Sequence, residues 1–258
     1  MQDLEEQRAY LCRLTPDRAL ESLGDAHEFL QDRGLLTRTP DSALPSLFEA
    51  CHEEPYKAGS RGFGSWPATK YPWYFELAAR ADVHELKVHL GKSILFSDET
   101  LPLVDSICRS ELARMEQEDE CSQLLRHLGE AGPSTPADLQ TELELKPKEL
   151  KRLRQPLERR GAVVSRSLRI ELPDGGHTHT SELLRYDQAY PEPAEATGSV
   201  DDLVVAAVHA AVLAPEREIV RKWFSWKWLF ADDLVERLVT EGRLQRSAPG
   251  WVTAPASA

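Results

Sequence analysis

The chain has 258 residues and a formal net charge of −12, with 43 acidic side chains against 31 basic ones. Apolar residues make up 41% of it, which is enough for a packed core and excludes wholesale disorder. It contains no run of about 18 apolar residues, and its acidic first six residues lack the apolar stretch of a secretory signal. We therefore expect a cytoplasmic protein that binds no membrane. The acidity also argues against indiscriminate nucleic-acid binding.

The first part of the chain predicts helices and one hairpin. The expected helical stretches are residues 1–34, Ser46–Glu53, Trp73–Ala81 and 98–115. Two strand-like runs, Val83–Leu90 and Ser93–Ser97, flank Gly91-Lys92, a dipeptide typical of a tight hairpin turn.

Residues 54–71, between these helices, combine three glycines, two prolines, four aromatic residues and three basic ones. Aromatic rings interleaved with cations suit base stacking and phosphate contact. Trp66 and Lys70 are therefore candidate nucleic-acid contacts. The alternative is an ordered loop whose rings pack beneath it.

The middle of the chain predicts three helices followed by a two-stranded wing. The helices are Cys121–Glu130, Ala137–Leu143 and Lys148–Arg160, and the strands Val163–Leu172 and His177–Tyr186 flank a turn at Pro173–Gly176. This order is that of a winged helix, a helix-turn-helix with a β-hairpin, whose third helix usually reads a DNA groove. That third helix is strongly basic, and its candidate DNA contacts are Lys148, Lys151, Arg152 and Arg154.

His177 and His179 share one face of the second wing strand, because side chains alternate along a strand. A wing histidine can contact a phosphate or a base edge. A metal site needs at least one further ligand, and the spacing fixes none. Both residues can also be ordinary strand residues that contact a neighbouring module.

The last part of the chain predicts another unit of the same kind. Its expected elements are the linker Pro191–Ser199, helices at Val200–Leu213 and Asp232–Glu241, and short strands at Arg243–Arg246 and Trp251–Thr253. Three tryptophans and three cations fall within residues 221–228. We expect two of these tryptophans in the core and one exposed, with Lys222 and Lys227 as phosphate contacts.

These elements predict an α+β fold, mainly α, built of tandem winged-helix modules. The expected division is a helical lead-in with a first module (1–115), a central winged helix (116–190) and a C-terminal module (199–258). The four cysteines lack the spacing of zinc ribbons or redox motifs, so we expect buried, reduced thiols. No motif for a phosphate loop, a nucleophile elbow or a zinc protease occurs, and we expect no cofactor and no metal.

The tandem plan resembles the AlkZ/YcaQ family of bacterial DNA glycosylases, and in particular its shorter, divergent AlkZ-related members. The block Arg33–Phe48 resembles the family's Gly-Leu pair, catalytic motif and following helix. The hairpin Lys87–Leu95 resembles the strand pair before the family's second module, and Trp223–Trp228 is similar to a segment of the divergent members. The resemblance implies a role in DNA repair.

The resemblance also implies a catalytic Gln-x-Gln or Gln-x-Asp just after the Gly-Leu pair. One of its side chains orients a water, and the other supports the charge that develops on the sugar. Those places fall on Leu36 and Arg38, with Thr37 between them, or on Thr37 and Thr39 after a slip of one residue. Leucine cannot hold a water and arginine cannot accept its proton. No catalytic residue is therefore carried over from the family.

We consequently expect a protein that binds double-stranded DNA and recognises damaged or deformed duplex, alkylated duplex included, without the usual glycosylase step. One alternative is an active glycosylase in which a residue such as His52, Glu53 or Glu54 replaces the missing glutamines. Another is an acidic winged-helix module that binds protein partners. The sequence leaves the oligomeric state open.

Overall fold

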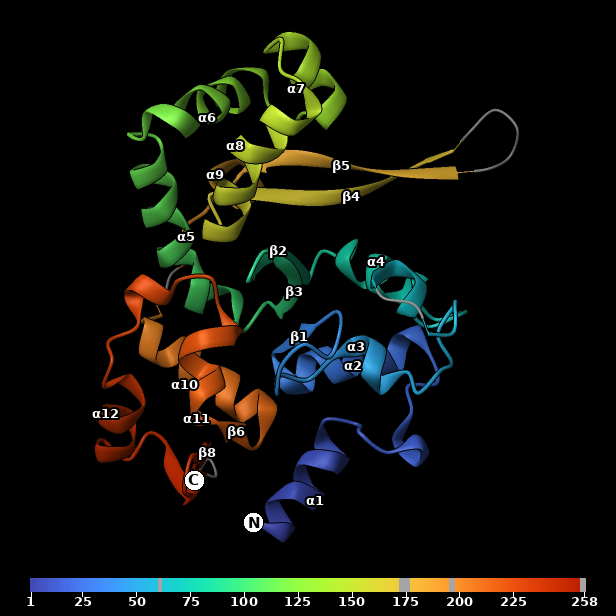
Figure 1. Cartoon of the computed structure of the whole chain (residues 1–258), viewed down its shortest axis with the longest axis vertical. Coiled ribbons are helices and arrows are strands. Elements are labelled where there is room, and N and C mark those ends of the chain that lie inside the picture. The colour runs from blue at the N-terminus through green and yellow to red at the C-terminus, as the bar shows by residue number, and fades with distance from the viewer. Residues whose placement is uncertain (60–61, 172–176, 195–197, 256–258) are drawn as a thin grey trace.

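The computed structural model describes residues 1–59, 62–171, 177–194 and 198–255. Within them the chain is α+β and mainly helical, with three small antiparallel sheets (Figure 1). The turn predicted at Pro173–Gly176 lies outside the described residues. None of the described helices is long and apolar enough to cross a membrane.

The N-terminal part builds a three-stranded antiparallel sheet, against which two of its helices pack. The strands are β1 (Leu35–Thr37), β2 (Val83–His89) and β3 (Lys92–Ser97), in the order β1-β3-β2. The helices are α1 (Gln2–Leu11), α2 (Leu23–Arg33), α3 (Leu47–Ala50) and α4 (Pro72–Ala78), and of these α2 and α4 pack against the sheet. The predicted hairpin forms, but its turn is Leu90-Gly91 rather than Gly91-Lys92, because Lys92 already pairs with His89 as the first residue of β3. The helices expected at Ser46–Glu53 and Trp73–Ala81 form as α3 and α4, and each is shorter than the sequence suggested. The sequence predicted no strand at β1, which pairs with β3.

The central part follows the predicted order of elements. The connecting helix is α5 (Leu101–Met115), and the unit itself consists of α6 (Asp119–Ala131), α7 (Pro136–Glu142), α8 (Pro147–Arg160), β4 (Val163–Glu171) and β5 (His177–Arg185). Thr135 and Asp138 form a capping box that starts α7, and Gly161 ends α8 with a φ of 76°. The second wing strand stops before Tyr186, because that residue begins the short helix α9 (Tyr186–Ala189).

The C-terminal part forms a second three-stranded sheet beside two helices. Its elements are α10 (Val200–Ala211), β6 (Ala214–Pro215), α11 (Glu216–Glu218), a π-helical turn (Ile219–Trp223), the 3-10 turn η4 (Lys227–Leu229), α12 (Leu234–Thr240), β7 (Gln245–Ala248) and β8 (Trp251–Thr253). Two expected boundaries were wrong. The helix expected at Asp232–Glu241 is shorter, and β7 begins at Gln245 rather than Arg243.

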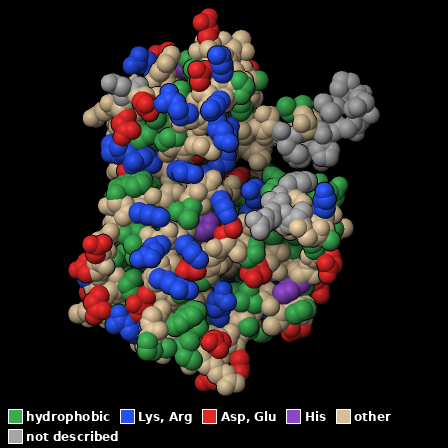
Figure 2. Space-filling view, in the orientation of Figure 1, with side chains coloured by type: hydrophobic (Ala, Val, Ile, Leu, Met, Phe, Trp, Pro, Cys, Tyr) green, Lys and Arg blue, Asp and Glu red, His purple; other side chains and the backbone are tan. Residues whose placement is uncertain are grey.

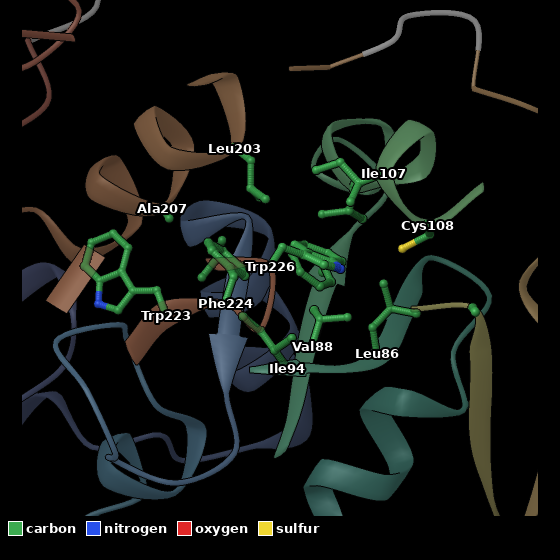
Figure 3. Close-up of a cluster of buried hydrophobic side chains, with 14 of the residues drawn as sticks. Leu86, Val88, Ile94, Ile107, Cys108, Leu203, Ala207, Trp223, Phe224 and Trp226 are labelled. Atoms are coloured by element: carbon green, nitrogen blue, oxygen red, sulfur yellow. The ribbon is translucent and has the colours of Figure 1, made fainter. Parts of the chain in front are cut away.

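One hydrophobic cluster runs through all three parts of the chain (Figure 3). Trp223 and Trp226 are fully buried in it, beside Phe224, whereas Trp228 is 48% exposed. The expectation of two core tryptophans and one exposed tryptophan is therefore confirmed. All four cysteines are also buried and free, as expected. Because the segment 223–226 packs between the β2–β3 hairpin, α5 and α10, it fixes the three parts against each other.

Candidate nucleic-acid interface

Helix α8 separates its apolar and basic side chains onto different faces. Leu150, Leu153 and Leu157 are buried in the central core. The exposed side chains include the cations Lys148, Lys151, Arg152 and Arg159. Figure 2 shows Lys and Arg side chains gathered over the upper and middle part of the face that it displays. The net negative charge of the chain is thus unevenly distributed.

Several of these cations are not neutralised by a neighbour. Lys148, Lys151 and Arg159 have no carboxylate partner among the residues that the structure describes. Arg152 contacts Glu120 at 3.2 Å, but both side chains are well exposed, so that pair is weak. A phosphate group can therefore reach these four side chains without displacing a buried partner.

Two adjacent hollows beside α8 form one basic cleft. The larger has a volume of about 600 Å³ and the smaller about 150 Å³, and both are lined by Gln155 and Arg159. The cations lining the two hollows are Lys87, Arg152, Arg154, Arg159, Arg160 and Lys227. They come from β2, α8 and η4, so residues from the three parts of the chain meet here.

A partly buried ion pair fixes one wall of the basic cleft. Lys87 on β2 donates to Glu158 on α8 at 2.7 Å, and Glu158 also accepts a hydrogen bond from the hydroxyl of Ser165. Arg154 lies 3.5 Å from the same carboxylate. Glu158 thus binds the first part of the chain to the central part, and the cations around it have a fixed position.

The positions of the expected catalytic motif do not present water-binding groups. Leu36 is fully buried in the cluster of hydrophobic side chains beside the N-terminal sheet. The hydroxyl of Thr37 donates to main-chain carbonyls, those of Thr39 and Pro45, both at 3.1 Å. The guanidinium of Arg38 lies over the rings of Trp66 and Tyr74, at 4.5 and 5.3 Å from their centroids.

A buried carboxyl group, Glu85, lies on the same face of this sheet. Leu95 on β3 pairs with both Leu36 and Glu85, so the three side chains project to one side. The hydroxyl of Tyr74 donates to Glu85 at 3.2 Å. Burial raises the pKa of Glu85, although Ser93, Lys87 and Arg38 act in the opposite direction. Sequence reasoning missed this residue, because nothing in the strand pattern shows that a glutamate points inward.

Replacing Glu85 with glutamine is expected to stabilise the protein at neutral pH and to change little in acid. Because the folded-state pKa is raised above the ordinary value of 4.5, ionisation of Glu85 opposes folding. That cost is absent below about pH 4.5 and develops as the pH rises through the folded-state pKa. Thermal unfolding of both proteins at several pH values tests this. A difference in Tm that does not grow with pH contradicts it.

His52 and Glu53 are both engaged in hydrogen bonds, His52 with the N-terminal segment and Glu53 with the loop that follows it. The Nε2–H of His52 donates to the carbonyl of Arg13 at 2.7 Å. Glu53 accepts bonds from the hydroxyl and amide of Thr69, at 2.5 and 3.0 Å, and from the amide of Lys70 at 2.9 Å. Partial desolvation raises the pKa of Glu53, but these hydrogen bonds outweigh it and the pKa is lowered. A carboxylate so engaged is a poor candidate for activating a water.

The remaining sequence candidates divide into two groups. Arg152, Arg154 and Lys227 line the basic cleft, and Lys148 and Lys151 lie on the exposed face of α8. Three others are engaged elsewhere. The ammonium group of Lys70 donates to the carbonyls of Leu20 and Cys51, Lys222 pairs with Glu218 at 2.7 Å, and Trp66 lies beneath Arg38.

The side chains of His177 and His179 lie outside what the structure describes, so their expected contacts stay predictions. Within the described residues, no three His, Cys, Asp or Glu side chains gather as metal ligands. Arg159 and Arg160 belong to the basic helix that the sequence indicated. Lys87 carried no signal, because its place in the basic cleft depends on how β2 packs against α8.

The fold is similar to that of a solved structure, the Streptomyces sahachiroi DNA glycosylase AlkZ. The match has a TM-score of 0.55 and 13% sequence identity, and it covers 98% of this chain and 69% of that one. The sequence matches no protein-family model and no curated protein. At this identity the likeness shows a shared fold, and the chemistry has to be argued from the residues present.

Proposed function

We propose that this protein binds double-stranded DNA through the basic cleft and the exposed face of α8, and recognises damaged or deformed duplex without excising a base. The observation that carries the proposal is the gathering of six cations, against Glu158 as the single carboxylate among the described lining residues, in one cleft of a chain whose net charge is −12. Such local positive potential attracts a polyanion even when the whole molecule repels it. The AlkZ-like fold supports the choice of DNA.

In this proposal α6, α7, α8 and the β4–β5 hairpin act as a winged helix within tandem modules at residues 1–115, 116–190 and 199–258. Contacts from Lys148, Lys151, Arg152 and Arg159 to phosphates set the position of the duplex, because such contacts orient a protein without reading sequence. Recognition then depends on the shape and deformability of the DNA more than on base edges.

The proposed absence of base excision follows from the residues at the motif positions. Leu36 is buried among apolar side chains and Arg38 lies over two aromatic rings. Neither offers a carboxylate or carboxamide to a water, and the usual glycosylase step needs one.

A second candidate function is an active glycosylase, and Glu85 is the observation that favours it. A buried carboxyl group with a raised pKa is the kind of residue that exchanges protons in catalysis. It lies on the sheet face that carries Leu36, so it would act beside the original motif. We rank this second because the hydroxyl of Tyr74 already donates to that carboxyl group.

One experiment separates these functions. The protein is incubated with undamaged duplex and with duplex carrying alkylated bases, and both retention and abasic sites are scored. Retention without abasic sites supports the proposal. Abasic sites that disappear in the Glu85→Gln variant support the second candidate. If neither duplex is retained, DNA binding is wrong and a protein-interaction role gains support.

A further inference from the structure

The tip of the β2–β3 hairpin carries a strained and exposed leucine. Leu90 has a φ of 53°, in the left-handed region that glycine and asparagine adopt more readily than leucine. It is 38% exposed, so a substantial part of its apolar side chain stays in water. A backbone outlier that the surrounding structure maintains at such a position points to a function for the side chain.

The hairpin tip is held firmly in place. The amide of Ser225 donates to the carbonyl of Val88 at 2.7 Å, and Nδ1–H of His89 donates to the carbonyl of Trp223 at the same distance. Burial lowers the pKa of His89, which keeps its ring neutral. On the other side the hairpin meets α8 so closely that a Cβ at Gly91 would lie 2.6 Å from Nε of Arg159. Leu90 therefore projects from a rigid support.

Trp228 stands in the same cavity as Leu90, and it too is fixed. Its Nε1–H donates to Glu111 at 3.3 Å, and the guanidinium of Arg160 lies over its ring at 4.0 Å. Nevertheless the residue stays 48% exposed. Leu90 and Trp228 line the larger hollow of the basic cleft, with its volume of about 600 Å³, together with Arg152, Arg159, Arg160 and Lys227. The site thus combines two apolar side chains with four cations, of which Arg160 is paired with Glu111 at 2.7 Å.

We propose that Leu90 and Trp228 receive an unstacked nucleotide of a deformed duplex. This inference rests on the DNA binding proposed above. The indole offers a surface on which any base can stack. Leucine is among the side chains that proteins insert between base steps, where it fills the gap that unstacking leaves. Arg152, Arg159 and Lys227 neutralise the phosphates on either side of that nucleotide, whereas Arg160 is already paired with Glu111 at 2.7 Å. This pair would give the protein its preference for deformed over regular duplex.

The test compares binding to a fully matched duplex with binding to the same duplex carrying a single-nucleotide bulge. In Leu90→Asn the cations remain, and asparagine tolerates the left-handed turn, so Tm should rise by about 2 °C. Affinity for matched duplex should stay within about twofold, whereas the preference for the bulge should fall about tenfold. Trp228→Leu should lose the same preference. A protein that is more stable yet less selective cannot be explained by misfolding.

Leu229→Asn is the matched control, because Leu229 is also 38% exposed and follows Trp228, but does not line the cavity. It should keep the wild-type preference. If the wild type binds matched and bulged duplex equally, or if Leu90→Asn and Trp228→Leu both keep its preference, this inference is wrong while DNA binding stands. If the wild type binds neither duplex, the proposed function and this inference are both overturned.

Discussion

Changing Lys151, Arg152 and Arg159 together to alanine is expected to weaken duplex binding about 10²-fold at about 0.1 M salt. Each phosphate contact releases condensed counterions, so the slope of log K against log salt should fall in magnitude by about 2 to 3. Fluorescence anisotropy with a labelled duplex at several salt concentrations measures both quantities. The two readouts together distinguish lost phosphate contacts from a general loss of affinity.

The fold should survive this triple substitution. All three side chains are exposed, and the one ion pair that they form with other described residues, Arg152 with Glu120, is itself exposed. Surface changes of this kind usually alter stability by less than about 0.5 kcal/mol each.

The control for this experiment removes three exposed cations that do not line the basic cleft: Arg80, Arg126 and Arg217. It changes the net charge equally and should leave the salt slope unchanged. If both variants lose affinity equally, net charge rather than the basic cleft governs binding. If neither variant changes it, the face of α8 lies outside the interface.

Replacing Leu36 with glutamine is expected to destabilise the protein by about 2–4 kcal/mol and to create no abasic sites. Leu36 is fully buried, in a cluster with residues such as Leu30, Leu47 and Phe48. A carboxamide there loses the apolar contacts and leaves polar atoms without partners. Restoring the residue type that the resemblance implies therefore does not restore its chemistry. Urea unfolding and an abasic-site assay measure the two effects.

Leu229→Gln provides the control for this prediction, since it makes the same exchange at a half-exposed position and should cost less than about 0.5 kcal/mol. The opposite outcome would be informative. If a protein with glutamine at positions 36 and 38 is as stable as the wild type and excises alkylated bases, the strand can turn these side chains toward DNA. The interpretation of residues 36–38 as core would then be wrong.

Local chemistry determined much of the central unit. The apolar spacing of Leu150, Leu153 and Leu157 sets which face of α8 is buried, and the cations that the sequence singled out lie on its other faces. The Thr135 cap and the left-handed Gly161 set the helix boundaries, because both act through hydrogen bonds and backbone angles within a few residues. Such short-range effects can be predicted from sequence alone. The number of buried tryptophans in residues 221–228 could also be predicted, because a small C-terminal unit needs large apolar side chains to fill its core.

Contacts between distant residues decided the site. Lys70 and Lys227 were equal candidates in sequence, yet Lys70 donates to the carbonyls of Leu20 and Cys51, whereas Lys227 lines the basic cleft. Lys87 and Glu85 lie two residues apart on β2, yet packing places Lys87 in the basic cleft and buries Glu85. An amino-acid type states what a side chain can bind. Which partner it finds depends on elements far along the chain, so only the tertiary structure separates a cation that can meet DNA from one that holds the fold.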